Sequence, residues 1–381
     1  MSGYTELKHI ECNFKRESGS EAVVSKDSSR VVFNHRTFSG GGGAIVNLTT
    51  GSKQELEKKL TGDTLHLEWS KCGSYISSGG KSASVYDSTT GQSIFDFPKY
   101  DRNEIRSTSW CAYDTNLVAG TCRDKYVRVF DLRSKTVARQ LNVSCEKYYQ
   151  MKAFGVDWSN CNGMLACCSR AKLGDYESII VSVIDPKTGN MCDNYDLGDR
   201  KFGCISWSPS SKTISGYYGN RSIFLIQEHT SVRTEFVMPF VDFWCNIEYV
   251  EWSANDNELL VCCSDGQSMI ITVCNGRVSI VPTQGCARWL KSDDINSKKL
   301  MMLDDGRITL YDISTEIINM NEPLWYGYET TIKNPFNIVP LKKREMYDMM
   351  RVLYETGRNS EVDAEVKKIQ EKLFGPRPVY E

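Results

Sequence analysis

Few residues of this 381-residue chain have the types and spacing that enzyme chemistry requires. The GGKS stretch at 79–82 resembles the end of a phosphate-binding loop, in which backbone amides cradle phosphate and the lysine reaches its terminal groups. A complete loop would have its first glycine at position 75, where the chain has Tyr75, and it would lead into a helix. We therefore interpret the stretch as a turn between two strands.

The patterns that metal binding and nucleophilic catalysis require are also missing. The 15 cysteines include no CxxC pair, and none of the four histidines has a second ligand at zinc-site spacing. Neither G-x-S-x-G nor a comparable nucleophile signature occurs. The acidic pairs Asp293–Asp294 and Asp304–Asp305 fall in predicted turns, which favours solvated charges over acid–base catalysis. We therefore expect no enzyme activity, no metal and no cofactor.

Composition predicts a folded protein with no strong overall attraction to polyanions. Hydrophobic residues make up 40% of the chain, enough for a large core. The 46 basic and 48 acidic residues nearly balance, so nucleic-acid binding would need a local basic patch. The sequence has neither a signal-peptide pattern nor a run of about eighteen apolar residues. We expect a soluble cytoplasmic protein that does not bind membranes, and a nuclear location stays open.

One short pattern recurs along the chain: an apolar strand ending in Trp, usually followed by Ser, then a polar turn and a second strand. LHLEWSKCGSYISSGG (65–80) and CISWSPSSKTISGYY (204–218) are two copies. Successive tryptophans lie 41, 48, 49, 45 and 37 residues apart, near the roughly 40–45-residue period of a propeller blade. These repeat tryptophans are Trp69, Trp110, Trp158, Trp207, Trp252 and Trp289.

A third strand follows in most copies and often ends in an apolar or aromatic residue before Asp. SASVYDSTTGQ (82–92) and YVRVFDLRSKT (126–136) are examples. The earlier stretch 22–52 repeats the same strands and turns without the Trp. The chain therefore contains seven repeat units.

These repeats resemble the WD40-repeat family over about residues 20–315. In the best single match, TCRDKYVRVFDLRSKT (121–136), Asp124 falls on the family's turn aspartate, Phe130 replaces the usual Trp, and Asp131 closes the dipeptide. The resemblance implies an all-β, seven-bladed propeller. No unit has the Gly-His dipeptide that usually opens a repeat, so the family's buried His-Ser-Asp-Trp tetrad is incomplete here.

We expect the propeller to occupy residues 1–315. Within it, residues 1–15 should close the ring, with LKHIECNF (7–14) as the outer strand of the last blade, because closure removes exposed strand edges. Residues 316–341 are interpreted as an irregular strap.

Residues 342–381 predict a C-terminal helical extension. Ser360 and Asp363 form a capping box for its second helix. Apolar residues recur at i, i+3, i+4 and i+7 in its first helix, and methionines suit adaptable binding surfaces. This first stripe, expected to contact either a partner or the propeller itself, consists of Met346, Met349, Met350 and Leu353.

The WD40 resemblance also implies which residues surround one mouth of the central channel. They precede each innermost strand or end the second strand. On blades three to five they form a basic and aromatic arc, whereas blades two and six have Asp63 and Glu248. Such an arc suits an acidic or phosphorylated protein segment, or RNA phosphate, with ordinary surface charge as the alternative. The arc consists of Arg106, Arg123, Lys152, Phe154, Arg170, Lys201 and Tyr218.

The sequence therefore favours a non-catalytic scaffold or adaptor subunit of a multiprotein complex, with partners on the propeller faces and the C-terminal helices. An RNA-contacting accessory subunit of an RNA-processing or RNA-modifying complex is the alternative. A small-molecule substrate is not expected. Steep salt dependence of binding would distinguish RNA from a protein partner.

Overall fold

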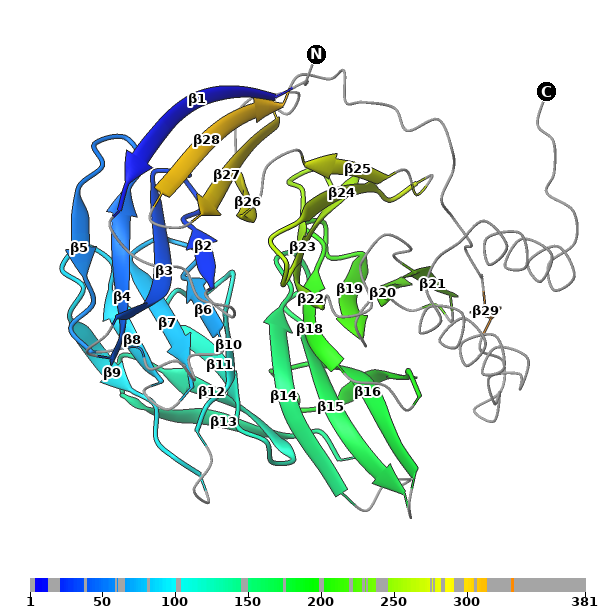
Figure 1. Ribbon diagram of the computed structural model, residues 1–381. Coiled ribbons are helices and arrows are strands. Elements are labelled where there is room, and N and C mark those ends of the chain that lie inside the picture. Colours follow the sequence, from blue (N-terminus) through cyan, green and yellow to red (C-terminus); the bar gives the residue numbers. More distant parts are fainter. Residues whose placement is uncertain are drawn as a thin grey trace, which may run out of the picture. The chain divides into compact units, whose positions relative to one another are not determined.

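Seven antiparallel sheets, built from strands that follow one another along the chain, make up the computed structural model (Figure 1). The chain divides into two units, Met1–Thr331 and Ile332–Glu381, and every described residue belongs to the first. The structure describes residues 4–12, 21–37, 40–58, 60, 66–80, 83–100, 104–144, 150–173, 176–198, 202–218, 222–227, 230, 232–237, 246–274, 276, 278–281, 285–290, 298–304, 307–313 and 330–331.

Each sheet is one blade of a propeller, and in blades one to six the four main strands pair in sequence order. Blades one to three consist of β2 Ala22–Val24, β3 Arg30–Thr37, β4 Gly40–Asn47 and β5 Lys53–Glu55; β6 His66–Trp69, β7 Tyr75–Gly79, β8 Ser84–Asp87 and β9 Ser93–Asp96; β10 Ser107–Trp110, β11 Leu117–Thr121, β12 Tyr126–Asp131 and β13 Thr136–Asn142. Blades four to six consist of β14 Gln150–Trp158, β15 Leu165–Leu173, β16 Tyr176–Ile184 and β17 Met191–Asp196; β18 Phe202–Trp207, β19 Thr213–Tyr218, β20 Ser222–Gln227 and β21 Val232–Val237; β22 Ile247–Trp252, β23 Glu258–Cys263, β24 Ser268–Thr272 and β25 Val278–Val281.

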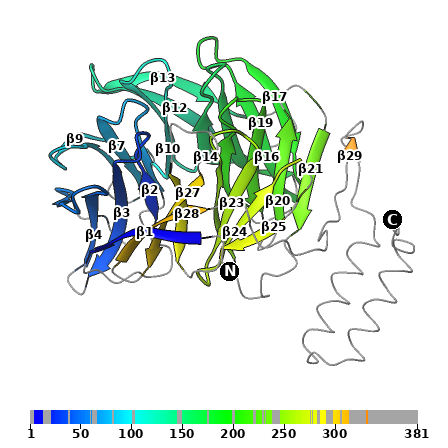
Figure 2. The same cartoon turned by 90° about the horizontal axis from the view of Figure 1, so that it is seen from above.

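Blade seven combines both ends of the propeller sequence. Its first three strands are β26 Cys286–Leu290, β27 Lys298–Asp304 and β28 Arg307–Ile313, and its outer strand is β1 Tyr4–Glu11. Strand β1 runs antiparallel to β28, and the two lie side by side in Figures 1 and 2. Lys8 Nζ also donates to the carbonyl of Leu48 in blade one at 3.3 Å. The N-terminal strand thus joins the last blade and contacts the first, which removes an exposed edge.

The hydrophobic core lies between blades rather than within one layer. Ile205 and Trp207 of β18, for example, pack in one cluster with Val181 and Val183 of β16. All six repeat tryptophans end or nearly end an innermost strand, and each is at most 8% exposed. The repeat tryptophans therefore belong to the hydrophobic core in blades two to seven.

The Ser that follows Trp shapes the next turn. Ser70 Oγ accepts a hydrogen bond from the backbone amide of Tyr75 at 2.9 Å, and Ser253 Oγ accepts one from Glu258 at 3.0 Å. A short hydroxyl side chain satisfies a turn amide that would otherwise lack a protein partner. The recurring Trp-Ser pair therefore ends one strand and starts the turn into the next.

The Asp that closes the third strand acts in the same way at the next turn. Asp87 Oδ1 accepts from the amides of Thr89 and Thr90 at 2.9 and 2.8 Å. Gly91 then has a φ of 72°, in the left-handed region where glycine is unstrained. Blade three has Lys135 at the equivalent position, also left-handed with a φ of 55°.

A different polar cluster joins blades two and three where the family's tetrad is incomplete. Trp110 Nε1 donates to Ser77 Oγ at 2.9 Å, and Ser77 Oγ lies 2.8 Å from Thr108 Oγ1. All three side chains are buried. Hydroxyl groups therefore satisfy the buried indole without a histidine.

Most of the C-terminal part lies outside the described residues, including the expected helices at 342–381 with Met346, Met349, Met350 and Leu353. Within the expected irregular strap at 316–341, the structure describes β29 Thr330–Thr331, which pairs with β21. Those two residues were predicted as irregular but form strand, because the outer edge of blade five offers backbone groups for pairing.

Candidate functional site

A polar cavity of about 1040 Å³ occupies the centre of the ring, and all seven blades contribute to its wall. Its lining changes in character from one region to another. Cations gather where blades three and four begin their innermost strands, and carboxylates from several blades line the wall beyond them. The cavity lining therefore consists of two groups of side chains.

The first group, the polar belt, consists of the residues directly before the repeat tryptophans. Because successive side chains of a strand point to opposite faces, these residues lie on the face opposite the Trp. Five of them line the cavity, and the sixth, Ser109, is buried beside it. The polar belt consists of Glu68, Ser109, Asp157, Ser206, Glu251 and Arg288.

Three members of the polar belt accept the backbone amide of the Trp in the next blade. Asp157 Oδ2 accepts from Trp207 N at 2.6 Å. Ser109 Oγ accepts from Trp158 N at 2.9 Å, and Glu251 Oε2 accepts from Trp289 N at 3.1 Å. An innermost strand has one unpaired edge, so its amides need partners from outside its own sheet. The polar belt supplies those partners and holds adjacent blades together.

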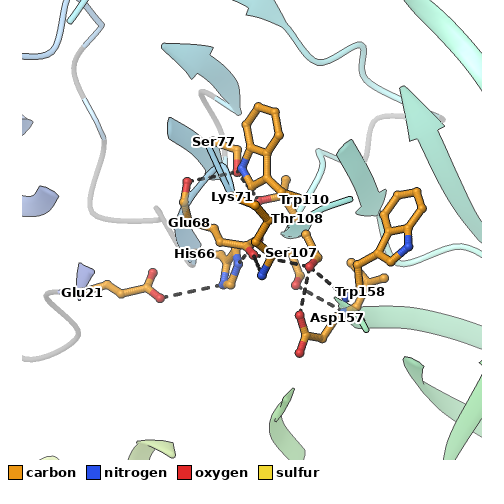
Figure 3. A network of polar contacts seen from close by, with 12 residues as sticks. Glu21, His66, Glu68, Lys71, Ser77, Ser107, Thr108, Trp110, Asp157 and Trp158 are labelled. Atoms are coloured by element: carbon orange, nitrogen blue, oxygen red, sulfur yellow. Dashed lines mark hydrogen bonds and ion pairs between the residues drawn. The ribbon is translucent and has the colours of Figure 1, made fainter. Parts of the chain in front are cut away.

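Asp157, which lies next to Trp158 in Figure 3, connects three blades in this way. Its Oδ1 accepts from Ser109 Oγ of blade three at 2.9 Å, while Oδ2 accepts from blade five. Burial raises the pKa of Asp157 above its ordinary value, because desolvation penalises the carboxylate. A carboxylate whose two oxygens each accept a hydrogen bond from a neighbouring blade, one from a hydroxyl and one from a backbone amide, has a structural role.

His66 lies between two carboxylates of the cavity wall (Figure 3). Its Nδ1 is 3.8 Å from Glu21 Oε1, and its Nε2 is 3.8 Å from Glu68 Oε2. Lys71 Nζ approaches the other oxygen of Glu68 at 3.8 Å. Burial by itself lowers the pKa of His66, but Glu68 and Glu21 outweigh it and raise the pKa to about 9. His66 is therefore an imidazolium at neutral pH and links blades one and two electrostatically.

The second group, the basic mouth, comes from blades three and four and comprises Arg106, Arg123, Lys152, Arg170 and Lys172. Strands β14 and β15 are nine residues long, and their extra length carries the last three cations. The turn with Arg123 is fixed to β14 by a hydrogen bond from its amide to Ala153 O at 2.9 Å. A register shift between Ala153 and Gly155 inserts Phe154 as an extra residue in β14.

Five of the seven residues predicted for the arc line this one cavity: Arg106, Arg123, Lys152, Phe154 and Arg170. Lys201 lies outside the described residues, and for Tyr218 only the backbone, at the end of β19, is described. Of the two residues expected to oppose the arc, Glu248 lines the cavity and Asp63 lies outside the described residues. The structure thus places these five residues on the wall of one cavity, and their role in partner binding stays a prediction.

Sequence reasoning missed the polar belt, His66 and Lys172. Aligning the residue before each Trp would have revealed the polar belt, since that position is Glu, Ser, Asp, Ser, Glu and Arg in turn. The carboxylate partners of His66 could not be inferred because Glu21 precedes it by a full blade. Lys172 lies beyond the usual end of the second strand, in the extra length of β15.

In the described part of the chain, no group of three or more His, Cys, Asp or Glu side chains is placed to hold a metal ion. No helix of that part is long and apolar enough to span a membrane.

Comparison with known proteins supports the fold. The sequence matches no protein-family profile and no curated protein sequence. Among solved structures, the β-propeller domain of Cps50 (Swd1) from Myceliophteria thermophila aligns with a TM-score of 0.58 at 12% identity, covering 80% of this chain and 100% of that domain. At this identity the likeness concerns architecture. Together with the sheet topology, it shows that the chain has the fold of a seven-bladed WD40-type β-propeller.

Proposed function

We propose that this protein is a non-catalytic scaffold, an adaptor subunit that holds partner proteins in a larger complex. The observation that carries the proposal is the basic mouth, a group of cations beside Phe154 on a closed ring of blades. Arginine and aromatic side chains on a rigid support supply much of the energy of protein docking sites. The propeller faces would bind partners, and the segment 342–381 would offer a further surface.

The polar belt supports a scaffold rather than an enzyme. Asp157 and Glu251 use carboxylate oxygens to accept backbone amides of the next blade. A general acid or base needs a carboxyl group that can exchange protons with a substrate within hydrogen-bond reach. The acidic side chains of the cavity thus have a sufficient explanation in blade-to-blade bonding, and fold alone does not decide function.

The proposal is tested by purifying the tagged full-length chain from native extract and sizing it before mass spectrometry. We expect elution well above the mass of one chain, with other proteins in fixed ratio. Charge reversal at Arg106, Lys152 and Lys201 should remove a subset of these proteins while the melting temperature stays unchanged. Elution as a single chain without partners would contradict the scaffold proposal.

RNA contact through the same cations is the competing proposal, and the same purification distinguishes it. Phosphate contacts release counterions, so binding to RNA weakens steeply as salt rises. A complex that survives nuclease treatment and moderate salt supports protein docking. A complex that dissociates under both treatments supports the RNA-contacting accessory subunit.

A further inference from the structure

The hairpin of β14 and β15 places like charges opposite each other. Lys152 is the direct cross-strand partner of Arg170, and Lys172 lies two residues further on the same face of β15. Like charges at directly opposite positions destabilise a sheet. Lys152 and Arg170 are also exposed, so the packing of the blade does not require them. Repulsion between like charges that the fold does not need is typical of a binding site, because functional sites often depart from the rules that favour folding.

Negative charge around these three cations is scarce. Among the described residues, Glu177 is the one carboxylate that pairs with any of them, through Oε2 at 3.8 Å from Arg170 Nε. That distance is longer than a charge-assisted hydrogen bond. The hairpin therefore has room, and net positive charge, for an external anion.

The arrangement suits a phosphoryl group better than a carboxylate. A phosphoryl group at neutral pH carries close to two negative charges on three acceptor oxygens, so it can contact several cations at once. Arg170 provides a guanidinium fork, and its central carbon lies 5.8 Å from the ring centre of Phe154. The aromatic ring restricts the guanidinium and so lowers the entropy lost on binding.

The rest of the cavity disfavours a long polyanion such as RNA. Beyond the basic mouth, the wall carries carboxylates from blades one, two, four and six: Glu21, Glu68, Asp157, Glu248 and Glu251. A nucleic acid needs a basic track along its backbone and several aromatic stacking platforms. His66, Lys71 and Arg288 also line this wall, but His66 and Lys71 lie beside Glu21 and Glu68, and Arg288 lies over the ring of Tyr249. One phosphoryl group fits this charge pattern, whereas a polymer of them would meet repulsion.

We propose that the basic mouth binds a phosphorylated serine or threonine in a segment of a partner protein. Lys152, Arg170 and Lys172 contact the phosphoryl oxygens, and Arg106 and Arg123 attract the segment from the neighbouring blade. This rests on the scaffold function proposed above and adds to it a dependence on the phosphorylation of the partner.

The first test measures binding of the full chain to fluorescent peptide pools that are degenerate except at a central phosphothreonine. Matched pools carry threonine or glutamate at that position. We expect binding of the phosphorylated pool only, weakened about tenfold in the double variant Lys152→Gln/Arg170→Gln, because two charge-assisted contacts are lost. The double variant Arg139→Gln/Lys187→Gln removes the same charge from exposed sites elsewhere and should bind like the parent. Equal binding of all pools, or no binding, overturns the proposal.

Glu177→Gln provides a test that misfolding cannot imitate. Removing this carboxylate frees Arg170 and raises the positive charge of the hairpin. Affinity for the phosphorylated pool should rise by about twofold, as for loss of one weak competing ion pair. An unchanged or lower affinity counts against the site. Tighter binding of a single-stranded RNA 20-mer than of the phosphopeptide pool, lost in the same double variant, would assign the hairpin to RNA instead.

Phosphatase treatment distinguishes this inference from the scaffold function itself. Partners that co-purify with the chain and leave after phosphatase treatment support both proposals. Partners that stay after complete dephosphorylation overturn the phosphoryl site and leave the scaffold function standing. Purification without any partner overturns the scaffold function, and the peptide measurements then judge the phosphoryl site by themselves.

Discussion

The polar belt and the basic mouth line the same cavity, but their charged side chains have opposite kinds of neighbours. In the polar belt, Asp157 and Glu251 face backbone amides of the next blade. In the basic mouth, Lys152 faces Arg170 across the hairpin. The polar belt thus contributes to the stability of the closed ring, whereas the basic mouth adds repulsion that a ligand would relieve. Substitutions in the polar belt should therefore mainly lower the stability of the fold, whereas substitutions in the basic mouth should mainly weaken binding.

The largest loss of stability is expected for Trp207→Ala. Its ring is 3% exposed and packs between blades four and five, and its amide donates to Asp157. Truncating a buried aromatic residue of this size costs about 3–5 kcal/mol. Urea unfolding followed by tryptophan fluorescence measures the effect. Tyr113→Ala, which removes a ring that is 64% exposed, should cost less than about 1 kcal/mol. Equal losses for both would contradict the assignment of the repeat Trp to the core.

Asp157→Ala should cost about 2–3 kcal/mol, because it leaves the buried amide of Trp207 without its acceptor and the hydroxyl of Ser109 with Glu68 Oε1 at 3.4 Å in place of Asp157. Asp157→Asn keeps one acceptor oxygen and should cost less. The matching change in the basic mouth, Glu177→Ala, removes an exposed pair and should cost under about 0.5 kcal/mol. If Glu177→Ala proved as damaging as Asp157→Ala, the two regions would not differ in the way described.

His66→Gln should destabilise the protein by about 1–2 kcal/mol at pH 6 and by little at pH 9.5. Carboxylates raise the pKa of His66 to about 9 in the folded chain, above its ordinary value of 6.5. A raised pKa adds stability that is complete below pH 6.5 and is lost as the pH rises through 9. Thermal melts of both proteins across this range measure the difference. His9→Gln, on the exposed side of β1, is the control. A pH-independent loss would assign His66 a packing role.

The smallest effect on stability is expected for Lys152→Gln, and the sign of the change in unfolding free energy is what tests the description. Removing one of two facing cations should leave stability unchanged or raise it by up to about 0.5 kcal/mol. Chemical unfolding at low ionic strength gives the best sensitivity, since salt screens surface charges. A loss above about 1 kcal/mol would show that Lys152 supports the blade.

The sequence by itself determined the repeat, and through it the blades. The residues that shape a repeat unit lie within that unit. Its Trp packs beside a neighbouring blade, and the Ser after it, such as Ser70 or Ser253, bonds to an amide of the following turn. Asp87 and Gly91 form the next turn. These contacts span a few residues, so their pattern is visible in a linear reading. The distance of Lys152 and Arg106 from the next Trp likewise identified the cavity rim.

Only the tertiary structure decided which charges meet. Glu21 reaches His66 from another blade, and Asp157 accepts from blades three and five at once. Such partners are separated by roughly one repeat period of about 40–45 residues and meet only after the ring closes. The facing of Lys152 and Arg170 depends in turn on hairpin register, because a shift of one residue turns every side chain to the other face. The repeat is encoded by residues close together in the sequence, but the cavity wall is assembled from residues of all seven blades.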